Sequence, residues 1–171
     1  MAYRGPAYSD DTEETVALDA ASRLAFGENS PLYQKLVIAE QKVDVLRAGP
    51  PDHLDPELFE IIARVENPAD LGTVEGQIVP TAQQFAAGPI DEKKLQDLKE
   101  HLRYDFALQL DSSEAIAQTL AAWIALRRTP ESVNRYYDMY AKLTAADIRQ
   151  AARKYLVESG RTVVTLTGTA K

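Results

Sequence analysis

The chain has no cysteine and only two histidines, and these two shortages exclude much chemistry. Without cysteine there can be no disulfide bond, thiolate nucleophile or cysteine-bound zinc. The histidines, His53 and His101, lie far apart, and the motif His-x-x-Glu-His does not occur. Hydrolytic zinc sites of that type need two imidazoles on one helix face and a carboxylate beside the metal-bound water. The sequence cannot assemble such a site, and no metal ligands or catalytic residues are expected in it.

An excess of basic residues is also missing, since the formal net charge is −7. Nucleic-acid binding needs a basic surface, so this charge opposes it, and it weakly opposes binding to anionic membrane surfaces. No apolar run is long enough to suggest a membrane span. The N-terminal residues lack the apolar segment of a signal peptide. We expect any signal to lie upstream of Met1, which leaves the compartment open between bacterial cytoplasm and periplasm.

What is present fits one soluble globular domain over residues 1–171, with 45% hydrophobic and 26% charged residues. We expect an edge strand within residues 2–8, then a helix that starts at Ser9 and ends at Gly27. A second helix should start at Ser30, with Pro31 in its first position. Alternating residues then predict two strands, near 43–46 and over 58–65, joined as a hairpin by a longer loop.

Residues 67–158 have the apolar spacing of consecutive helices. Gly88-Pro89 should end the first of these helices, Asp91 and Thr144 should cap later ones, and a strand over 163–166 should close the domain. The predicted order is one strand, two helices, two strands, five helices and one strand. It predicts an α+β fold in which helices cover one face of an antiparallel sheet. The strand count is low for such a sheet, so a further strand is expected upstream of Met1.

Several segments, in this order, resemble the non-catalytic half-domain of pitrilysin/insulinase-type zinc metallopeptidases. They are residues 3–7, 29–36 (Asn-Ser-Pro-Leu-Tyr-Gln-Lys-Leu), 90–95 (Ile-Asp-Glu-Lys-Lys-Leu), 129–137, 143–156 and 162–168. Members of this family pair two similar α+β halves, in one chain or in two, and only one half carries His-x-x-Glu-His. The resemblance implies the architecture of a mitochondrial-processing-peptidase-like half-domain and a fragment of a longer two-half or two-subunit protease.

By this resemblance the chain would cradle a peptide substrate while a zinc-bearing catalytic half, in cis or in trans, cleaves it. The chain itself would be inactive alone and would bind no cofactor, because the zinc would belong to the partner half. A homodimer is left open. An alternative is a protease-like structural or assembly subunit without peptidase activity. A third reading is a generic α+β binding domain outside the family.

One departure from the family pattern affects the site. Many non-catalytic halves place an Arg directly after the leucine at Leu36 and a Tyr seven residues later, and both reach the substrate. Here these two positions hold Val37 and Asp44. Neither side chain can donate a hydrogen bond to a substrate carbonyl as Arg and Tyr do. We expect Val37 to face the core and Asp44 to be an exposed strand carboxylate, which leaves substrate binding at these two positions in doubt.

Other candidate sites have simpler interpretations. Asp97 and Asp105 lie one turn from His101 and could form a weak metal site, but a solvated helix face is expected. His53 should lie on a surface loop. The tyrosines at 136, 137 and 140, beside Arg135, could form a recognition platform, although their spacing favours helix packing.

Overall fold

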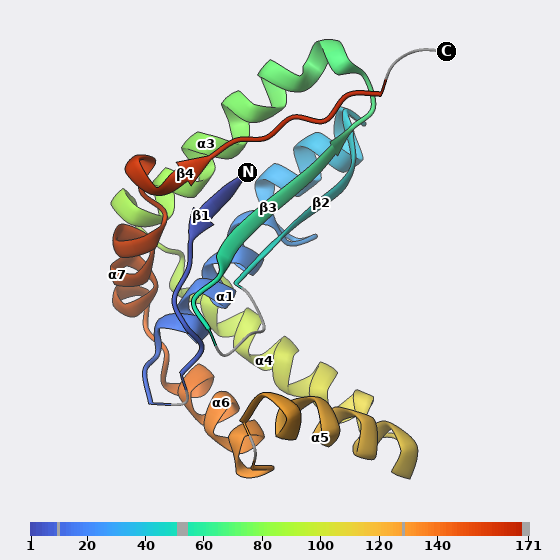
Figure 1. Ribbon diagram of the computed structural model, residues 1–171, viewed down its shortest axis with the longest axis vertical. Helices are drawn as coiled ribbons and strands as arrows, with labels where there is room; N and C mark the ends of the chain where they lie inside the picture. Colours follow the sequence, from blue (N-terminus) through green and yellow to red (C-terminus); the bar gives the residue numbers. More distant parts are fainter. Residues whose placement is uncertain (10, 51–54, 128, 169–171) are drawn as a thin grey trace.

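The computed structural model describes residues 1–9, 11–50, 55–127 and 129–168 (Figure 1). Helices are labelled α, short π- or 3-10-helical turns η, and strands β. In chain order they are β1 (Ala2–Arg4), α1 (Glu14–Phe26), α2 (Pro31–Tyr33), η1 (Gln34–Ala39), β2 (Val43–Gly49), β3 (Leu58–Val65), η2 (Pro68–Asp70), α3 (Leu71–Ala87), α4 (Glu92–Gln109), α5 (Ser113–Arg127), α6 (Glu131–Lys142), α7 (Ala145–Tyr155), η3 (Glu158–Gly160) and β4 (Arg161–Thr162). The predicted element order is confirmed.

The four strands form one sheet in the order β2-β3-β1-β4, and every neighbouring pair is antiparallel. The predicted hairpin of β2 and β3 is confirmed. His53, predicted to lie on a surface loop, is in the connection between these strands and lies outside the described residues. Helices α1, α3 and α7 pack against one another behind the sheet, and α1 contacts β2 (Figure 1). The predicted α+β fold, with an antiparallel sheet covered by helices on one face, is therefore confirmed.

The core lies between the sheet and these helices. Tyr3 of β1 and Phe59 and Ile61 of β3 are each no more than 1% exposed, and they meet Leu18 of α1 and Ile148 of α7 in one apolar cluster. Burying a large apolar side chain contributes roughly 1.5–3 kcal/mol to the free energy of folding. This cluster is therefore a major source of the stability that holds the helices against the sheet.

Local side-chain chemistry sets several helix ends where expected. Ser30 accepts a hydrogen bond from the Tyr33 amide at 3.1 Å and caps α2, with Pro31 in the first position. Gly27 closes α1, and a Cβ at Gly27 would lie 2.5 Å from the Arg23 carbonyl oxygen, which only glycine avoids. The chain then widens from α2 into the π-helical turn η1.

The predicted edge strand within residues 2–8 is wrong in its position, because β1 lies between β3 and β4 in the sheet. Two predicted boundaries are also wrong. Helix α1 begins at Glu14 rather than after Ser9, because the Ser9 hydroxyl accepts from the Asp11 amide in a local turn at 3.0 Å. The closing strand is Arg161–Thr162 rather than 163–166. Thr162 pairs with Ala2, and the next residues run on past β1 with no strand partner in the described part of the chain.

Helices α4, α5 and α6 project away from the sheet, so the molecule is a crescent with a body and an arm (Figure 1). Lys99 of α4 links α4 to α6 at the base of the arm. Its ammonium donates to the carbonyl oxygens of Ala141 and Leu143, at 3.0 and 2.6 Å, where α6 ends. A cation at a helix C-terminus is favoured by the helix dipole, so Lys99 holds α6 against α4. No helix in the described ranges has both the length and the apolar character needed to cross a membrane.

Candidate functional site

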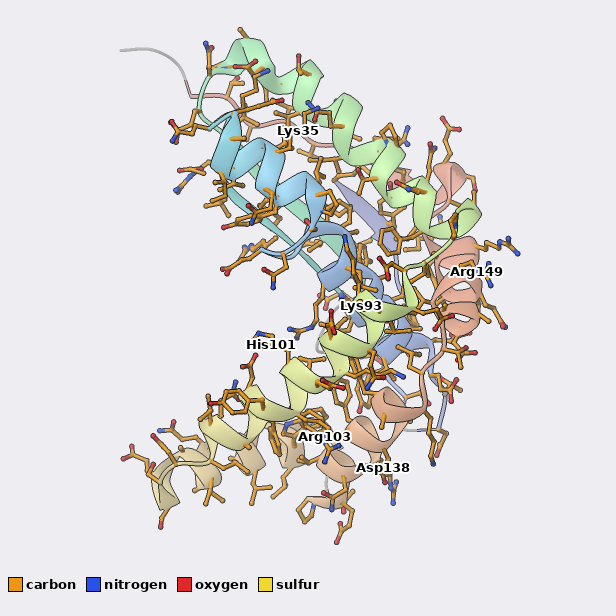
Figure 2. All side chains as sticks on the ribbon, turned by 180° about the vertical axis from the view of Figure 1, so that it is seen from behind. Lys35, Lys93, His101, Arg103, Asp138 and Arg149 are labelled. Carbon is orange, nitrogen blue, oxygen red and sulfur yellow. The ribbon has the colours of Figure 1, made fainter. Side chains whose placement is uncertain are left out.

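The candidate site lies on the concave side of the crescent, where body and arm face each other. Strand β2 is the sheet edge nearest this side (Figure 1). From the arm, His101 of α4 points into the same space (Figure 2). The β2 edge and one face of α4, which are far apart in sequence, thus both face the concave side of the crescent (Figure 1).

A cavity of about 390 Å³ lies between the C-terminal half of α1 and β2. Its wall includes Asp19 and Arg23 from α1, Tyr33 from α2, and Asp44 and Arg47 from β2. The wall is therefore rich in charged groups and contains one of the two site positions predicted from the sequence.

The two predicted site positions, Val37 and Asp44, have different surroundings in the structure. Val37 is half-buried in η1 and packs against the core cluster, as expected of an apolar helix residue. Asp44 is exposed on β2, as expected, and borders the cavity. The carboxylate of Asp44 meets a guanidinium on the neighbouring strand, so Asp44 and Val37 do not act as a pair.

That guanidinium belongs to Arg64 of β3. Its Nε donates to both carboxylate oxygens of Asp44 at 2.7 Å, and its Nη2 lies 2.5 Å from Oδ2. These hydrogen bonds lower the pKa of Asp44 and raise the pKa of Arg64, so both groups stay charged. The Asp44 side chain cannot itself donate a hydrogen bond to a substrate carbonyl. The Arg64 guanidinium, held beside it, can.

Sequence reasoning missed Arg64. The β2–β3 register pairs Val45 with Arg64 and Val43 with Val65, and the irregularity between these pairs places Asp44 next to Arg64. A β-bulge re-aims side chains in this way, and its position cannot be read from alternation alone. The sequence signal that could have identified Arg64 is its charge, which is opposite to that of Asp44 on the other strand of the predicted hairpin.

A second charged group links the cavity to the arm. Asp19 of α1 accepts from the Arg23 Nε at 2.8 Å and from the Tyr136 hydroxyl at 3.2 Å. Burial, and then the charge of Asp19, raise the pKa of Tyr136. Burial, the largest single cause, lowers the pKa of Arg23, but the charge of Asp19 and its hydrogen bond to Arg23, with smaller contributions from Tyr140 and Tyr136, together raise it. At neutral pH, Asp19 and Arg23 therefore form an ion pair, and the Tyr136 phenol that donates to Asp19 is neutral.

The tyrosines of α6 pack as expected rather than forming an exposed platform. Tyr140 is 2% exposed, and Tyr136 lies between it and Trp123, with ring centroids 5.8 and 5.0 Å away. Tyr137 stacks on Phe106 of α4 at 4.4 Å. These rings join α4, α5 and α6 into the arm.

The described residues of this chain do not fit a zinc site. His101 is exposed and its Nε2 lies 3.2 Å from the Asp105 carboxylate, an ordinary pair one turn apart on a helix. Over the described ranges, no group of three or more histidine, cysteine or acidic side chains is placed to hold a metal ion. His53, the other histidine, lies outside those ranges.

A larger hollow of about 480 Å³ lies between α1, α2, α3 and the start of α4. Its wall is mostly apolar and includes Pro31, Pro80 and Phe85, with Lys35 and Lys94 among its charged members. None of the predicted site residues lines it, so volume alone does not make it the better candidate.

The chain is similar to known proteins in sequence and in structure. No family model matches the chain. The chain is 25% identical over 167 residues to the zinc protease PqqE of Helicobacter pylori, a match covering 97% of this chain and 37% of that protein. The chain thus spans little more than a third of the length of this curated relative.

Solved structures share the fold. A protease from Helicobacter pylori superposes with a TM-score of 0.79 at 23% identity, covering 93% of this chain and 38% of that one. The inactive peptidase domain of a proposed zinc protease from Bordetella parapertussis gives 0.77 at 21% identity, covering 99% and 91%. The peptidase M16 inactive domain from Pseudomonas fluorescens gives 0.70 at 16% identity, covering 90% and 36%.

Fold and comparisons together show that this chain shares the α+β fold of peptidase half-domains described as inactive. The resemblance to the non-catalytic half of pitrilysin-type zinc metallopeptidases is thereby confirmed.

Proposed function

We propose that the chain is the non-catalytic half of a zinc endopeptidase and holds an extended peptide against a partner half that carries the zinc. The observation that carries the proposal is Arg64, a fixed guanidinium beside a cavity on the concave side. The sequence supports the division of labour, because it lacks His-x-x-Glu-His.

Arg64 is suited to hold a peptide rather than to react with it. Within the described part of the chain, its contacts to Asp44 use Nε and Nη2, and its side chain is 70% exposed. Nη1 therefore keeps two N–H donors for a peptide carbonyl or a carboxylate. Because Asp44 orients the guanidinium beforehand, binding costs less side-chain entropy than it would for a free arginine.

The test is reconstitution. This chain is mixed with the zinc-bearing half, and cleavage of a fluorogenic peptide is followed. We expect cleavage above that of the zinc-bearing half alone and none from this chain alone. A stable complex that cleaves no faster than the zinc-bearing half would refute the proposal.

A structural or assembly role is the second candidate, and Val37 favours it. The position that holds a substrate-binding Arg in many relatives is here an apolar side chain packed on the core. This role requires a stable complex that has no peptide turnover even with zinc bound. Zinc-dependent cleavage in the full complex would exclude it.

A further inference from the structure

The larger hollow, between α1, α2, α3 and the start of α4, has the size and the lining of a ligand site. Its volume is about 480 Å³, and ligand cavities in proteins typically measure roughly 300–1,000 Å³. Its wall is mostly apolar, and the side chains of Leu24, Phe85 and Ile90 in it are only half-buried. An apolar group that entered the hollow would remove this surface from water. Helix α1 also contributes to the cavity that Asp44 borders, so the two cavities are neighbours.

A proline within α3 places a backbone acceptor at the hollow. Proline has no N–H, so Pro80 cannot donate the usual helix hydrogen bond to the carbonyl oxygen of Gly76, four residues earlier. Both residues line the hollow. Gly76 has no side chain to cover its carbonyl, and a Cβ added there would meet nothing within 4 Å. The Gly76 carbonyl can therefore accept a hydrogen bond from a group bound in the hollow.

Two exposed lysines give the rim of the hollow a positive charge. Lys35 lies on the side of η1 that faces α3 (Figure 2), and Lys94 is in the first turn of α4. Lys35 is 3.7 Å from Glu40 in an exposed pair, and among the described residues no carboxylate pairs with Lys94. The acid in the wall, Asp91, caps α4, since it accepts from the amides of Lys93 and Lys94 at 2.9 and 3.2 Å. The rim is therefore suited to an anion.

We propose that this hollow binds the C-terminal residue of a peptide whose last side chain is apolar. Such a residue has a carboxylate for the two ammonium groups, an N–H for the Gly76 carbonyl and an apolar side chain for the wall. A fatty acid has the carboxylate and the apolar chain but no N–H, so the peptide matches more of the wall. The proposal rests on the proposed function only in taking this peptide to be the substrate held for the zinc-bearing half.

Binding is tested with this chain alone, so that the result does not depend on catalysis. The probe is the peptide Gly-Ser-Gly-Ser-Leu with a fluorescent label at its N-terminus, and its binding is followed by fluorescence anisotropy. The controls are the same peptide with a C-terminal amide and the same peptide ending in serine. We expect the leucine acid to bind about tenfold or more tightly than either control, because one control lacks the charge and the other the apolar side chain. Equal affinity for the acid and the amide would overturn the proposal.

Two variants test whether the peptide binds in this hollow. Gly76→Leu places a side chain in it, and Gly72→Leu, one turn earlier on α3 and outside the wall, is the matched control. Lys94→Met removes an ammonium group, and Lys93→Met, which is outside the wall, is its control. We expect Gly76→Leu to abolish binding and Lys94→Met to weaken it about tenfold, while both controls bind as the unchanged chain does. Unchanged affinity in Gly76→Leu would refute the site.

The source of the ligand is tested by competition and in the complex with the zinc-bearing half. Dodecanoate that displaces the labelled peptide at concentrations about tenfold below those of the unlabelled peptide would identify a fatty acid as the occupant and refute the proposal. In the complex, a substrate with a free C-terminal leucine should have a KM about tenfold lower than its amide, and Gly76→Leu should remove the difference. A complex that cleaves both substrates with the same KM refutes the inference and leaves the proposed function standing. Peptide binding to this chain without any cleavage in the complex supports the site and refutes the proposed function.

Discussion

The hydroxyl of Tyr136 on α6 donates to the carboxylate of Asp19 on α1 over 3.2 Å, across 117 residues of sequence. Asp19 also accepts from Arg23, so this carboxylate ties the arm of the crescent to its body. Because the arm forms one wall of the concave side, the Tyr136–Asp19 hydrogen bond helps to set the shape of the candidate site.

Tyr136→Phe should lower the free energy of unfolding by about 1–2 kcal/mol, because it removes a half-buried hydrogen bond to a charged acceptor. Urea unfolding followed by circular dichroism measures the change. Tyr104→Phe is the matched control, since Tyr104 is 63% exposed on α4. Equal midpoints for the two variants would contradict a linking role for Tyr136.

Alkaline pH should destabilise the fold. Burial is the largest cause that raises the pKa of Tyr3, Tyr136 and Tyr140. A tyrosine whose pKa is higher in the folded than in the unfolded state contributes stability that is complete below about pH 10 and declines as pH rises above it. Urea midpoints measured from about pH 8 to pH 11 should therefore fall, and fall less steeply in Tyr136→Phe. A flat profile would show that these phenols ionise freely in the folded protein.

The features that the sequence predicted correctly depend on neighbours in the chain. Ser30 and Asp91 cap helices because a side-chain oxygen reaches an amide two or three residues on. The apolar spacing of α3 and α7 likewise determines which face of each helix meets the core. The order of elements, and from it the fold class, follows from such local patterns.

Two of the missed features depend on partners far along the chain, and one depends on a local turn that competes with a helix cap. Ser9 could cap a helix by type, but it bonds Asp11 in a turn instead. Residues 163–166 have strand-forming side chains, yet the ladder ends at Thr162, because a strand exists only where a partner lies beside it. Arg64 becomes a site candidate only through a bulge in the opposite strand. Composition and spacing do not show which of these partners lie side by side, although the opposite charges of Asp44 and Arg64 on the predicted hairpin were compatible with a pair.

The capping box of α7 should account for a measurable part of the stability. Asp147 Oδ2 accepts from the Thr144 amide at 2.8 Å, and the Thr144 hydroxyl accepts from the Asp147 amide at 3.3 Å. Thr144→Ala should cost about 1 kcal/mol, typical for loss of a capping side chain. Thr165→Ala, in the exposed chain after β4, should leave the urea midpoint unchanged. A midpoint for Thr144→Ala equal to that of Thr165→Ala would mean that water replaces the cap.

Arg64→Met should weaken peptide binding in the complex with the zinc-bearing half without unfolding this chain. Methionine cannot donate to a carbonyl, and the ion pair it removes is exposed, so the urea midpoint should not change. Loss of a charged hydrogen bond to substrate should raise KM about tenfold at constant kcat, since the contact is made equally before and during cleavage. Arg64→Lys keeps the charge but loses the planar guanidinium, so its KM should lie between that of the unchanged chain and that of Arg64→Met. Arg149→Met, on α7 at the other side of the molecule (Figure 2), is the matched control. An unchanged KM in Arg64→Met would remove Arg64 from the substrate-binding surface.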